Sequence, residues 1–247
     1  MQAVITGASS GIGRDMAKIL SEKGYDLILV ARRRERLEEL KLPTKTKIFC
    51  YDLSVSEAVF EFYRQIENEP IDVFINNAGY GVFGSFFDNS LEDELGMLST
   101  NVTAVHILTK LILEKFQQQN RGYLLNVASS AAFYPGPMLA AYYATKAYVY
   151  RLTLGIYEEL RRKKSKVSVS VLCPGPVKTE FDRVANVNFS LKGLNSMDVA
   201  EYALKKMFRK KTVIIPGFTM KLGKFFSRFI PEKLLLFILY YVQKKKA

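Results

Sequence analysis

Short apolar runs alternate with longer segments of helical periodicity along most of the chain. The apolar runs, rich in β-branched residues, are residues 2–6, 26–31, 47–51, 72–76, 123–128, 167–173 and 212–216. The helical patterns fall at residues 12–23, 54–67, 92–118, 142–163 and 197–209. Strands of a parallel sheet are buried on both faces and are joined by crossover helices. The pattern therefore predicts an α/β fold: a single doubly wound, Rossmann-type domain with a parallel sheet of about seven strands and helices on both faces.

The pattern changes near residue 217, before which no repeat or linker interrupts the alternation. We interpret residues 1–217 as one domain and residues 218–247 as a C-terminal extension. In the first half of the extension three basic residues share one helical face and five apolar residues cover much of the other, which is typical of a basic amphipathic helix. These residues are Lys221, Lys224 and Arg228 on the first face, and Phe218, Leu222, Phe225, Phe226 and Phe229 on the second.

The net charge of +12 is concentrated at the C-terminal end. From Lys205 onward there are 12 basic residues and one acidic residue, Glu232, so this end carries 12 − 1 = +11 and the rest of the chain only +1. The nine apolar residues 234–242 would span roughly 14 Å as a helix, under half a hydrocarbon core. The extension cannot cross a bilayer, but it can lie on one, or pack on its own domain or on another subunit.

Composition narrows the class of protein further. The two cysteines, Cys50 and Cys173, lie in separate apolar runs, so we expect no disulfide and a reducing compartment. The N-terminus leaves no room for a signal peptide, and no uninterrupted apolar run approaches the length of a membrane span. We therefore expect a cytoplasmic protein, peripheral at the inner face of a membrane if the extension binds lipid. No nucleic-acid-reading module accompanies the charge, so nucleic acid is not an expected partner.

A glycine-rich turn connects the first predicted strand to the first predicted helix. Gly7, Gly11 and Gly13 allow a tight turn and a close approach of the backbone, so that a pyrophosphate can sit at the helix N-terminus. Their spacing differs from that of the common dinucleotide fingerprint. Their place directly after an N-terminal strand nevertheless indicates nucleotide binding.

Arginines follow the second predicted strand, where an NAD-binding fold offers an acidic residue to the ribose 2′-hydroxyl. Arg32 stands at that place and is followed by Arg33. A guanidinium there can bind a 2′-phosphate, which favours NADP(H) over NAD(H). We interpret Arg34 and Arg36 as the solvated start of a helix.

Two adjacent tyrosines precede a lysine in "AYYATKAY", residues 141–148. Tyr142 is four residues before Lys146 and Tyr143 is three before, and both spacings place the side chains on one face of a helix. The spacing alone does not show which tyrosine is a candidate acid–base catalyst.

Several motifs together resemble the short-chain dehydrogenase/reductase family in its common single-domain form, over residues 1 to about 217. They are "TGASSGIG" 6–13, "NNAG" 76–79, Asn101 in "TNVTAV", Ser129 in "NVASS", "YYATK" 142–146 and "PGPVKT" 174–179. The resemblance implies catalysis by Ser129, Tyr142 and Lys146, with Asn101 supporting a water-linked proton path, and it leaves Tyr143 as a packing or rim residue. Lys146 and an oxidised nicotinamide are expected to lower the pKa of Tyr142 from about 10.

The resemblance also implies a set of cofactor-binding residues. These are Thr6, Gly7, Ser9, Ser10, Gly11, Ile12, Gly13, Arg32, Arg33, Asp52, Leu53, Asn77, Ala78, Gly79, Tyr142, Lys146, Pro174, Gly175, Val177 and Thr179. The sequence thus predicts an NADP(H)-dependent oxidoreductase that transfers a hydride between nicotinamide and a carbonyl or alcohol. The alternatives are an NAD(H)-dependent dehydrogenase of the same type and a non-catalytic, membrane-recruited nucleotide sensor. Family members of this form are also expected to be homodimers or homotetramers.

The substrate side is predicted to be apolar, because the loops beyond the strands are uncharged and aromatic. The candidate pocket residues are Tyr80, Phe83, Phe86, Phe133, Tyr134, Met138 and Phe181, with residues 180–195 as the family's substrate lid. His106, the single histidine, is expected to be a packed, hydrogen-bonded helix residue. With one histidine and two separated cysteines, the sequence predicts no metal site.

Overall fold

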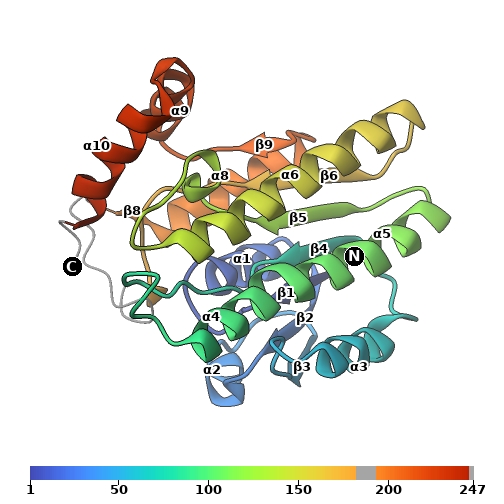
Figure 1. Ribbon diagram of the computed structural model, residues 1–247. Coiled ribbons are helices and arrows are strands. Elements are labelled where there is room, and N and C mark those ends of the chain that lie inside the picture. The colour runs from blue at the N-terminus through green and yellow to red at the C-terminus, as the bar shows by residue number, and fades with distance from the viewer. Residues whose placement is uncertain (182–192, 245–247) are drawn as a thin grey trace.

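A seven-stranded parallel sheet forms the centre of the protein (Figure 1). The structure is a computed structural model, which describes residues 1–181 and 193–244. The strand order is β3-β2-β1-β4-β5-β6-β9, and every neighbouring pair is parallel. The predicted doubly wound sheet is confirmed. Its strands are β1 (Gln2–Thr6), β2 (Asp26–Ala31), β3 (Thr46–Cys50), β4 (Val73–Asn76), β5 (Tyr123–Val127), β6 (Ser168–Leu172) and β9 (Val213–Ile214).

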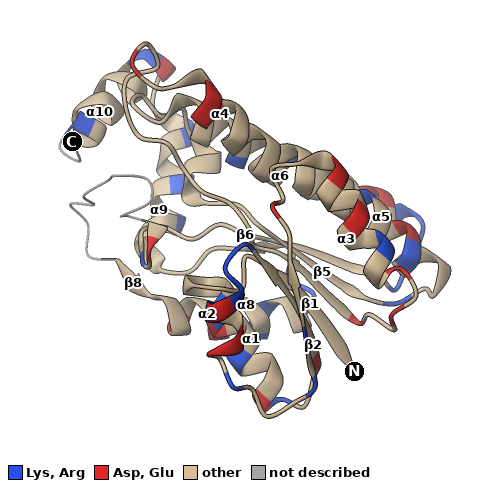
Figure 2. Ribbon diagram, turned by 90° about the horizontal axis from the view of Figure 1, so that it is seen from below, with Lys and Arg blue, Asp and Glu red and all other residues tan. Residues whose placement is uncertain are grey.

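Helices cover both faces of the sheet (Figure 2). One face packs against α1 (Gly11–Glu22), the short α2 (Arg34–Glu38) and α8 (Ser196–Phe208). The other packs against α3 (Ser56–Ile66), α5 (Val105–Gln118) and the end of α6 (Ala140–Arg162). The short strands β7 (Val177–Lys178) and β8 (Leu194–Asn195) form a separate parallel pair.

The strand sequences explain this burial. Successive side chains of a strand point to opposite faces. In β1, Ala3 and Ile5 join the cluster under α1 and α8, whereas Val4 joins the cluster under α3 and α5. Because both faces are covered, both sets of side chains must be apolar, which produces the uninterrupted apolar runs.

The predicted helix 92–118 has an irregular middle. It consists of α4 (Leu91–Leu98), a π-helical segment η1 (Ser99–Ala104) that contains Asn101, and α5. Single π-helical segments inside α-helices are frequent at functional sites. Leu91–Gln118 is long and apolar enough, by length and composition alone, to cross a bilayer. The sequence pattern does not predict such a segment, because polar residues interrupt its apolar runs. The apolar side chains of α5, such as Leu108 and Phe116, are nevertheless buried in the core, whereas Leu91 and Leu95 of α4 are exposed.

A buried polar network ties the centre of the sheet to two helices. The Asn126 Oδ1 atom accepts hydrogen bonds from Asn76 Nδ2 (2.9 Å) and Thr109 Oγ1 (3.3 Å). The Asn126 Nδ2 atom donates to Thr153 Oγ1 (3.0 Å). The four side chains come from β4, β5, α5 and α6, and all are almost fully buried. Hydrogen bonding within the group satisfies polar atoms that water cannot reach.

The extension folds into α9 (Phe218–Phe226), a 3-10 turn η3 (Ser227–Phe229) and α10 (Glu232–Lys244). Figure 1 shows both helices, in red, at one corner of the molecule beyond β9. Two of the three basic residues predicted on one face, Lys221 and Lys224, lie on α9 and contact the domain, whereas Arg228 lies on η3 and is exposed. The Lys224 Nζ atom donates to Tyr150 Oη (2.8 Å) and lies 4.5 Å from the ring centroid of Phe133. The apolar face points outward.

Candidate active site

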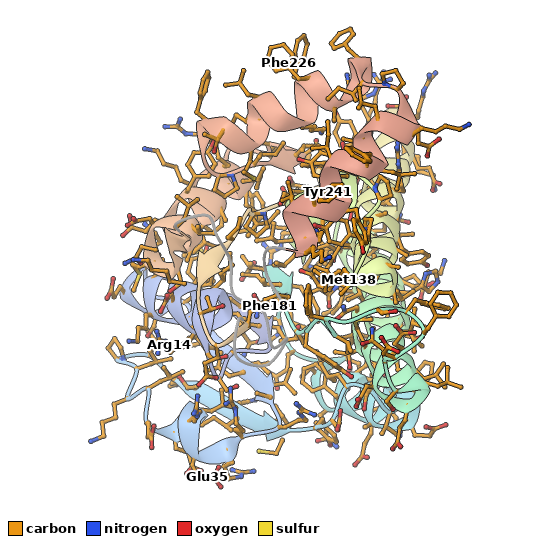
Figure 3. All side chains as sticks on the ribbon, turned by 60° about the vertical axis from the view of Figure 1, so that its left-hand side comes forward. Arg14, Glu35, Met138, Phe181, Phe226 and Tyr241 are labelled. Atoms are coloured by element: carbon orange, nitrogen blue, oxygen red, sulfur yellow. The ribbon has the colours of Figure 1, made fainter. Side chains whose placement is uncertain are left out.

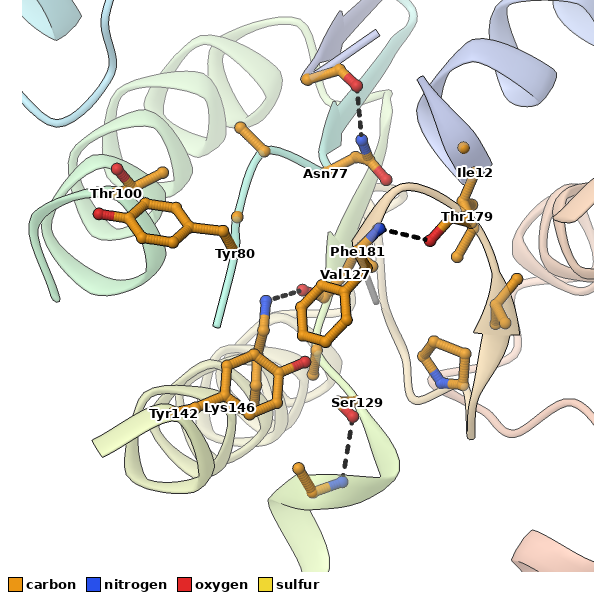
Figure 4. Close-up of a pocket in the computed structure, with 18 of the residues that line it drawn as sticks. Ile12, Asn77, Tyr80, Thr100, Val127, Ser129, Tyr142, Lys146, Thr179 and Phe181 are labelled. Carbon is orange, nitrogen blue, oxygen red and sulfur yellow. Dashed lines mark hydrogen bonds between the residues drawn. The ribbon is translucent and has the colours of Figure 1, made fainter. Parts of the chain in front are cut away.

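A cavity of about 560 Å³ lies beyond the carboxyl ends of the central strands (Figure 4). Residues from the turns after β1, β2, β4, β5 and β6 line it, together with α6 and the C-terminal helices. Ligands of open parallel sheets bind at this edge. The cavity collects almost all the residues predicted for cofactor and catalysis, and only Thr6, Gly13 and Asn101 of that set do not line it.

The glycine turn after β1 fits a close approach of a ligand to the backbone. Gly7 and Gly11 have φ of +65° and +53°, a region that side chains disfavour. A Cβ at Gly7 would lie 2.8 Å from the Ala78 Cα atom, and one at Gly11 would lie 2.9 Å from Thr179 Cγ2. The turn leads directly into α1, whose first N–H groups have no partners within the helix. This arrangement is the anion site that a pyrophosphate requires.

Thr6 and Gly13, both predicted to bind the cofactor, do not line the cavity and hold this turn from behind. The Thr6 Oγ1 atom accepts hydrogen bonds from the backbone N–H groups of Asn77 (2.9 Å) and Ala78 (3.0 Å). A Cβ at Gly13 would lie 2.3 Å from Asn77 Nδ2. Both residues therefore pack the "NNAG" segment against the glycine turn.

The arginines after β2 differ in their partners. The Arg32 side chain is 70% exposed and lies 3.7 Å from the Asp52 carboxylate. Arg33 donates to Ser9 Oγ (3.2 Å) and to Glu180 Oε2 (2.8 Å), and Arg36 also binds Glu180. Hydrogen bonds from Arg36 and Arg33 hold the pKa of Glu180 down at about 2. The interpretation of Arg36 as merely solvated is therefore wrong, whereas Arg34 pairs with Glu38 on the surface of α2.

Asp52 lies at the rim of the cavity between Arg32 and the start of α3. Burial by itself would raise the pKa of its carboxyl group. Hydrogen bonds from the Ser54 backbone and hydroxyl (2.9 and 2.8 Å) and the nearby Arg32 outweigh burial, so the pKa is lowered. The charged carboxylate is thus held in place by the protein itself.

Ser129, Tyr142 and Lys146 meet at the centre of the cavity (Figure 4). Ser129 follows β5 and caps a 3-10 turn, where its Oγ atom accepts from Ala131 N (3.1 Å). Tyr142 and Lys146 lie one turn apart on α6, with Lys146 Nζ 5.8 Å from the Tyr142 ring centroid. The Lys146 ammonium donates to the Val127 carbonyl oxygen (3.2 Å). Both side chains are buried.

Burial dominates the protonation of this pair. It raises the pKa of Tyr142 above its ordinary value, although the Ser129 hydroxyl lowers the pKa by a smaller amount. It lowers the pKa of Lys146 to about 8. The expectation of a lowered tyrosine pKa is therefore not met by the protein groups alone, because desolvation disfavours the charged forms of both side chains.

Asn101 lies behind the cavity wall and is fully buried. Its Oδ1 atom accepts from Tyr80 N (3.1 Å), and its Nδ2 atom donates to Tyr80 O (2.8 Å) and Thr145 Oγ1 (3.2 Å). A Cβ at Gly79 would lie 2.8 Å from Asn101 Oδ1 and 3.1 Å from Lys146 Nζ. The Asn101 side chain thus positions the Gly79–Tyr80 segment against Lys146 and does not itself reach the cavity.

The substrate side is only partly the one predicted. Tyr80, Tyr134 and Phe181 line the cavity, and the Phe181 ring centroid is 5.4 Å from that of Tyr142. Four candidates do not line it: Phe83, Phe86, Phe133 and Met138. Phe133 packs its ring against Tyr150 instead, and Phe86 is exposed. Most of the predicted lid, residues 182–192, lies outside the described residues.

The C-terminal helices supply part of the cavity wall, which the sequence did not predict. Met220, Leu239, Val242 and Gln243 line it. Gln243 is 1% exposed, and its Nε2 atom donates to Tyr143 Oη. Its Oε1 atom is buried without a hydrogen-bond partner among the described residues. Tyr143 is thereby confirmed as a rim residue of the cavity. In the sequence, the apolar run 234–242 indicated that this segment covers a surface, but it did not indicate which surface.

The single histidine lies away from this site. His106 is exposed on α5, and its Nδ1 atom is 2.6 Å from Tyr148 Oη. The predicted hydrogen bond is confirmed and the predicted packing is wrong, because this part of α5 faces outward. No group of three possible metal ligands occurs among residues 1–181 and 193–244.

Comparison with known proteins agrees with this geometry. Residues 1–188 match the family model described as short chain dehydrogenase. The chain is 31% identical over 208 residues to an uncharacterized oxidoreductase of Staphylococcus epidermidis, covering 82% of this chain and 90% of that protein. It is 30% identical over 198 residues to human 17-beta-hydroxysteroid dehydrogenase type 3, covering 77% of this chain and 63% of that protein.

A solved structure shows the same fold with a cofactor. It is a short-chain dehydrogenase from Sphingobium yanoikuyae in complex with NADPH, with a TM-score of 0.83, 28% identity and 88% coverage of each chain. The doubly wound sheet, the glycine turn and the Ser129, Tyr142 and Lys146 cluster define an NAD(P)-dependent oxidoreductase. Within that class, the chain belongs to the short-chain dehydrogenase family.

Proposed function

We propose that this oxidoreductase uses NADP(H) to reduce the carbonyl group of a hydrophobic substrate, or to oxidise the corresponding alcohol. The observation that carries the proposal is the single cavity in which Ser129, Tyr142 and Lys146 lie between a glycine-rich anion site and a wall of apolar side chains. A polar reaction centre inside an apolar wall suits a substrate that is apolar apart from its reacting group.

The residues present fit a nicotinamide dinucleotide. The turn at Gly7 and Gly11 and the start of α1 would hold the pyrophosphate, and Arg32 would bind a 2′-phosphate. Gly79, Pro174, Gly175, Val177 and Thr179 would line the nicotinamide end. When bound, the cofactor supplies the hydride to the carbonyl carbon or accepts it from the alcohol.

The protein groups manage the proton. In the reducing direction, Tyr142 Oη donates its proton to the carbonyl oxygen, and the high pKa set by burial keeps that proton on the phenol until the oxygen becomes basic. The Ser129 hydroxyl donates a hydrogen bond to the same oxygen and stabilises its developing charge. Lys146 orients the site from the next turn of α6. In the oxidising direction, Tyr142 accepts the alcohol proton.

Two similarities support the finer parts of the proposal. The Sphingobium yanoikuyae enzyme binds NADPH, and the human relative is named for a hydroxysteroid, a large and mainly apolar substrate. In this chain Leu239, Val242 and Phe181 extend the cavity wall with apolar surface. A cytoplasmic location and assembly as a homodimer or homotetramer remain predictions.

The test of substrate class is a screen of NADPH oxidation with aldehydes, small ketones, steroid ketones and 3-oxoacyl thioesters. We expect consumption that depends on the carbonyl compound and is fastest with the large apolar ones. Activity confined to small polar carbonyls would contradict the hydrophobic substrate, and no activity with any class would contradict the proposal as a whole.

The test of cofactor preference uses Arg32→Asp. The Arg32 guanidinium would make charge-assisted hydrogen bonds to the 2′-phosphate, which NADH lacks. Replacing it with a carboxylate should weaken NADPH binding by about 100-fold and improve the relative use of NADH. Arg34→Asp, on the exposed surface of α2, is the matched control and should change neither. Equal use of the two cofactors by the unmodified enzyme would contradict the assignment.

A further inference from the structure

The C-terminal helices carry a concentration of exposed apolar side chains. Half of the large hydrophobic residues exposed in the described parts of the chain lie between Phe218 and Val242. They are Phe218, Phe225, Phe226, Phe229, Leu234, Leu236, Phe237, Ile238, Tyr240, Tyr241 and Val242. Phe226, on α9, is labelled at the edge of the molecule in Figure 3. Contiguous exposed apolar surface of this kind marks an interaction site.

The orientation of α9 shows that this exposure is built into the fold. A surface helix normally buries its apolar face and leaves its lysines in water. Here Lys221 and Lys224 face the domain, where they contact the hydroxyls of Tyr202 (3.3 Å) and Tyr150 (2.8 Å). No residue of α9 is buried, and the Phe225 ring packs edge-on against its exposed neighbours Phe226 and Phe229. The phenylalanine face is therefore held outward by the lysine contacts.

Exposed basic residues lie on the same segments as these apolar side chains. They are Arg228, Lys233 and Lys244, on η3 and α10. Glu232 is the single acidic residue after Lys205. A second copy of the chain docked on this face would bring like charges together. An anionic surface would instead meet both the apolar side chains and the cations.

We propose that α9 and α10 dock the enzyme on the surface of an anionic lipid bilayer, with the phenylalanine and tyrosine side chains inserted at the headgroup boundary. The inner side of the same helices lines the cavity through Met220, Leu239 and Val242. Docking therefore places the substrate end of the cavity next to the lipid. Entry of an apolar substrate from the bilayer would follow from this placement, and that consequence rests on the proposed function. The docking itself does not.

The test is co-sedimentation of the full chain with vesicles of phosphatidylcholine alone and with added phosphatidylserine. Binding should favour the anionic vesicles and weaken between about 0.1 M and about 1 M salt, because the screening length falls from about 10 Å to about 3 Å. The double variant Arg228→Gln, Lys233→Gln should lose about 25-fold of the anionic binding, since each cation near the surface contributes about fivefold. Lys110→Gln, exposed on α5, is the control and should bind normally.

The double variant Phe226→Ser, Phe229→Ser tests whether the apolar side chains contribute to docking. Phe60→Ser, on α3, is the control. Phe60 is exposed on α3, and α3 lies on the other side of the molecule from α9 (Figure 1). The double variant should lose binding to both kinds of vesicle and keep its NADPH affinity, thermal stability and mass in solution. No binding by the unmodified chain, equal binding to neutral and anionic vesicles, or unchanged binding by the double variant would each overturn the proposal. A lower oligomeric mass of that variant would show an interface between copies and would also overturn it. None of these measurements requires turnover. A negative result would therefore contradict the docking proposal and leave the proposed function untouched.

Discussion

Tyr142 and Tyr143 are neighbours in sequence, yet their side chains have different surroundings. Tyr142 faces Ser129 and Lys146 at the centre of the cavity. Tyr143 lies at the rim, where it packs over Gly136 and accepts a hydrogen bond from Gln243. On a helix, adjacent residues point about 100° apart, so only one of them can face the reacting atoms.

We expect Tyr142→Phe to lower kcat by a factor of about 10² to 10⁴, because it removes the proton donor and little else. NADPH affinity, measured by fluorescence titration, should stay close to that of the unmodified enzyme. Tyr143→Phe is the matched control and should remain active. An inactive Tyr143→Phe together with an active Tyr142→Phe would show that the assignment of the two tyrosines is wrong.

Lys146 makes the stability of the protein depend on pH. Its pKa is about 8 in the fold and 10.5 for an ordinary lysine, so the unfolded chain binds more protons between these values. The free energy of unfolding should therefore rise with pH in that window. The Lys146→Met variant lacks this titrating group. Between pH 8 and pH 10.5, the free energy of unfolding of the unmodified protein should rise by about 3 kcal/mol more than that of the variant. Urea unfolding at both ends of the window measures it.

The control for this comparison is Lys110→Met, which removes an exposed lysine from α5. Its stability should differ from that of the unmodified protein by a similar amount at both pH values. A constant difference for Lys146→Met as well would mean that Lys146 is not desolvated in the fold.

At the scale of elements, α10 is both a wall of the cavity and an outer surface of the molecule. Its inner side places Gln243 against Tyr143, and the Gln243 Oε1 atom has no partner among the described residues. A buried acceptor without a partner costs free energy, which a donor on the substrate would recover. We therefore expect the enzyme to prefer substrates that carry a hydroxyl group remote from the reacting carbonyl.

We expect Gln243→Leu to raise KM about tenfold for a ketone with such a hydroxyl, since a lost hydrogen bond to a buried group costs about 1–3 kcal/mol. The KM of the matching deoxy ketone should fall or stay the same, and kcat should change little for either. Lys244→Ala, exposed next to Gln243, is the control. If Gln243→Leu changes both ketones equally, the carboxamide has only a packing role.

At the scale of the whole molecule, the network around Asn126 joins two central strands to two helices on one face of the sheet. Asn126 makes three of its hydrogen bonds, which are buried in the middle of the domain and join residues far apart in sequence. Such a network stabilises one arrangement of the layers, because any shift leaves polar groups without partners.

Asn126→Leu, of similar size, should lower the free energy of unfolding by about 3 kcal/mol, at about 1 kcal/mol for each hydrogen bond lost. Urea unfolding measures the change, and NADPH affinity should be kept because no member of the network lines the cavity. Thr103→Val, an exposed position of η1, is the control. A loss below about 0.5 kcal/mol would show that the network contributes little net stability.

The sequence by itself determined the sheet, the glycine turn after β1 and the candidate catalytic cluster. These features rest on local patterns: apolar runs that must be buried on both faces, glycines that fit the positive φ and the close contacts of the turn at Gly7 and Gly11, and the motif resemblance that selects Tyr142, Lys146 and Ser129. Such signals can be identified without knowing what lies opposite each residue.

Only the tertiary structure decided which residues meet across the chain. It separated Arg33, engaged by Glu180, from the exposed Arg32, and it moved Thr6, Gly13 and Asn101 behind the cavity wall. It also turned the lysines of α9 inward and brought Gln243 to Tyr143, 100 residues away. Periodicity shows that a helix has two faces but not which one the domain covers, because that depends on tyrosines contributed by distant helices.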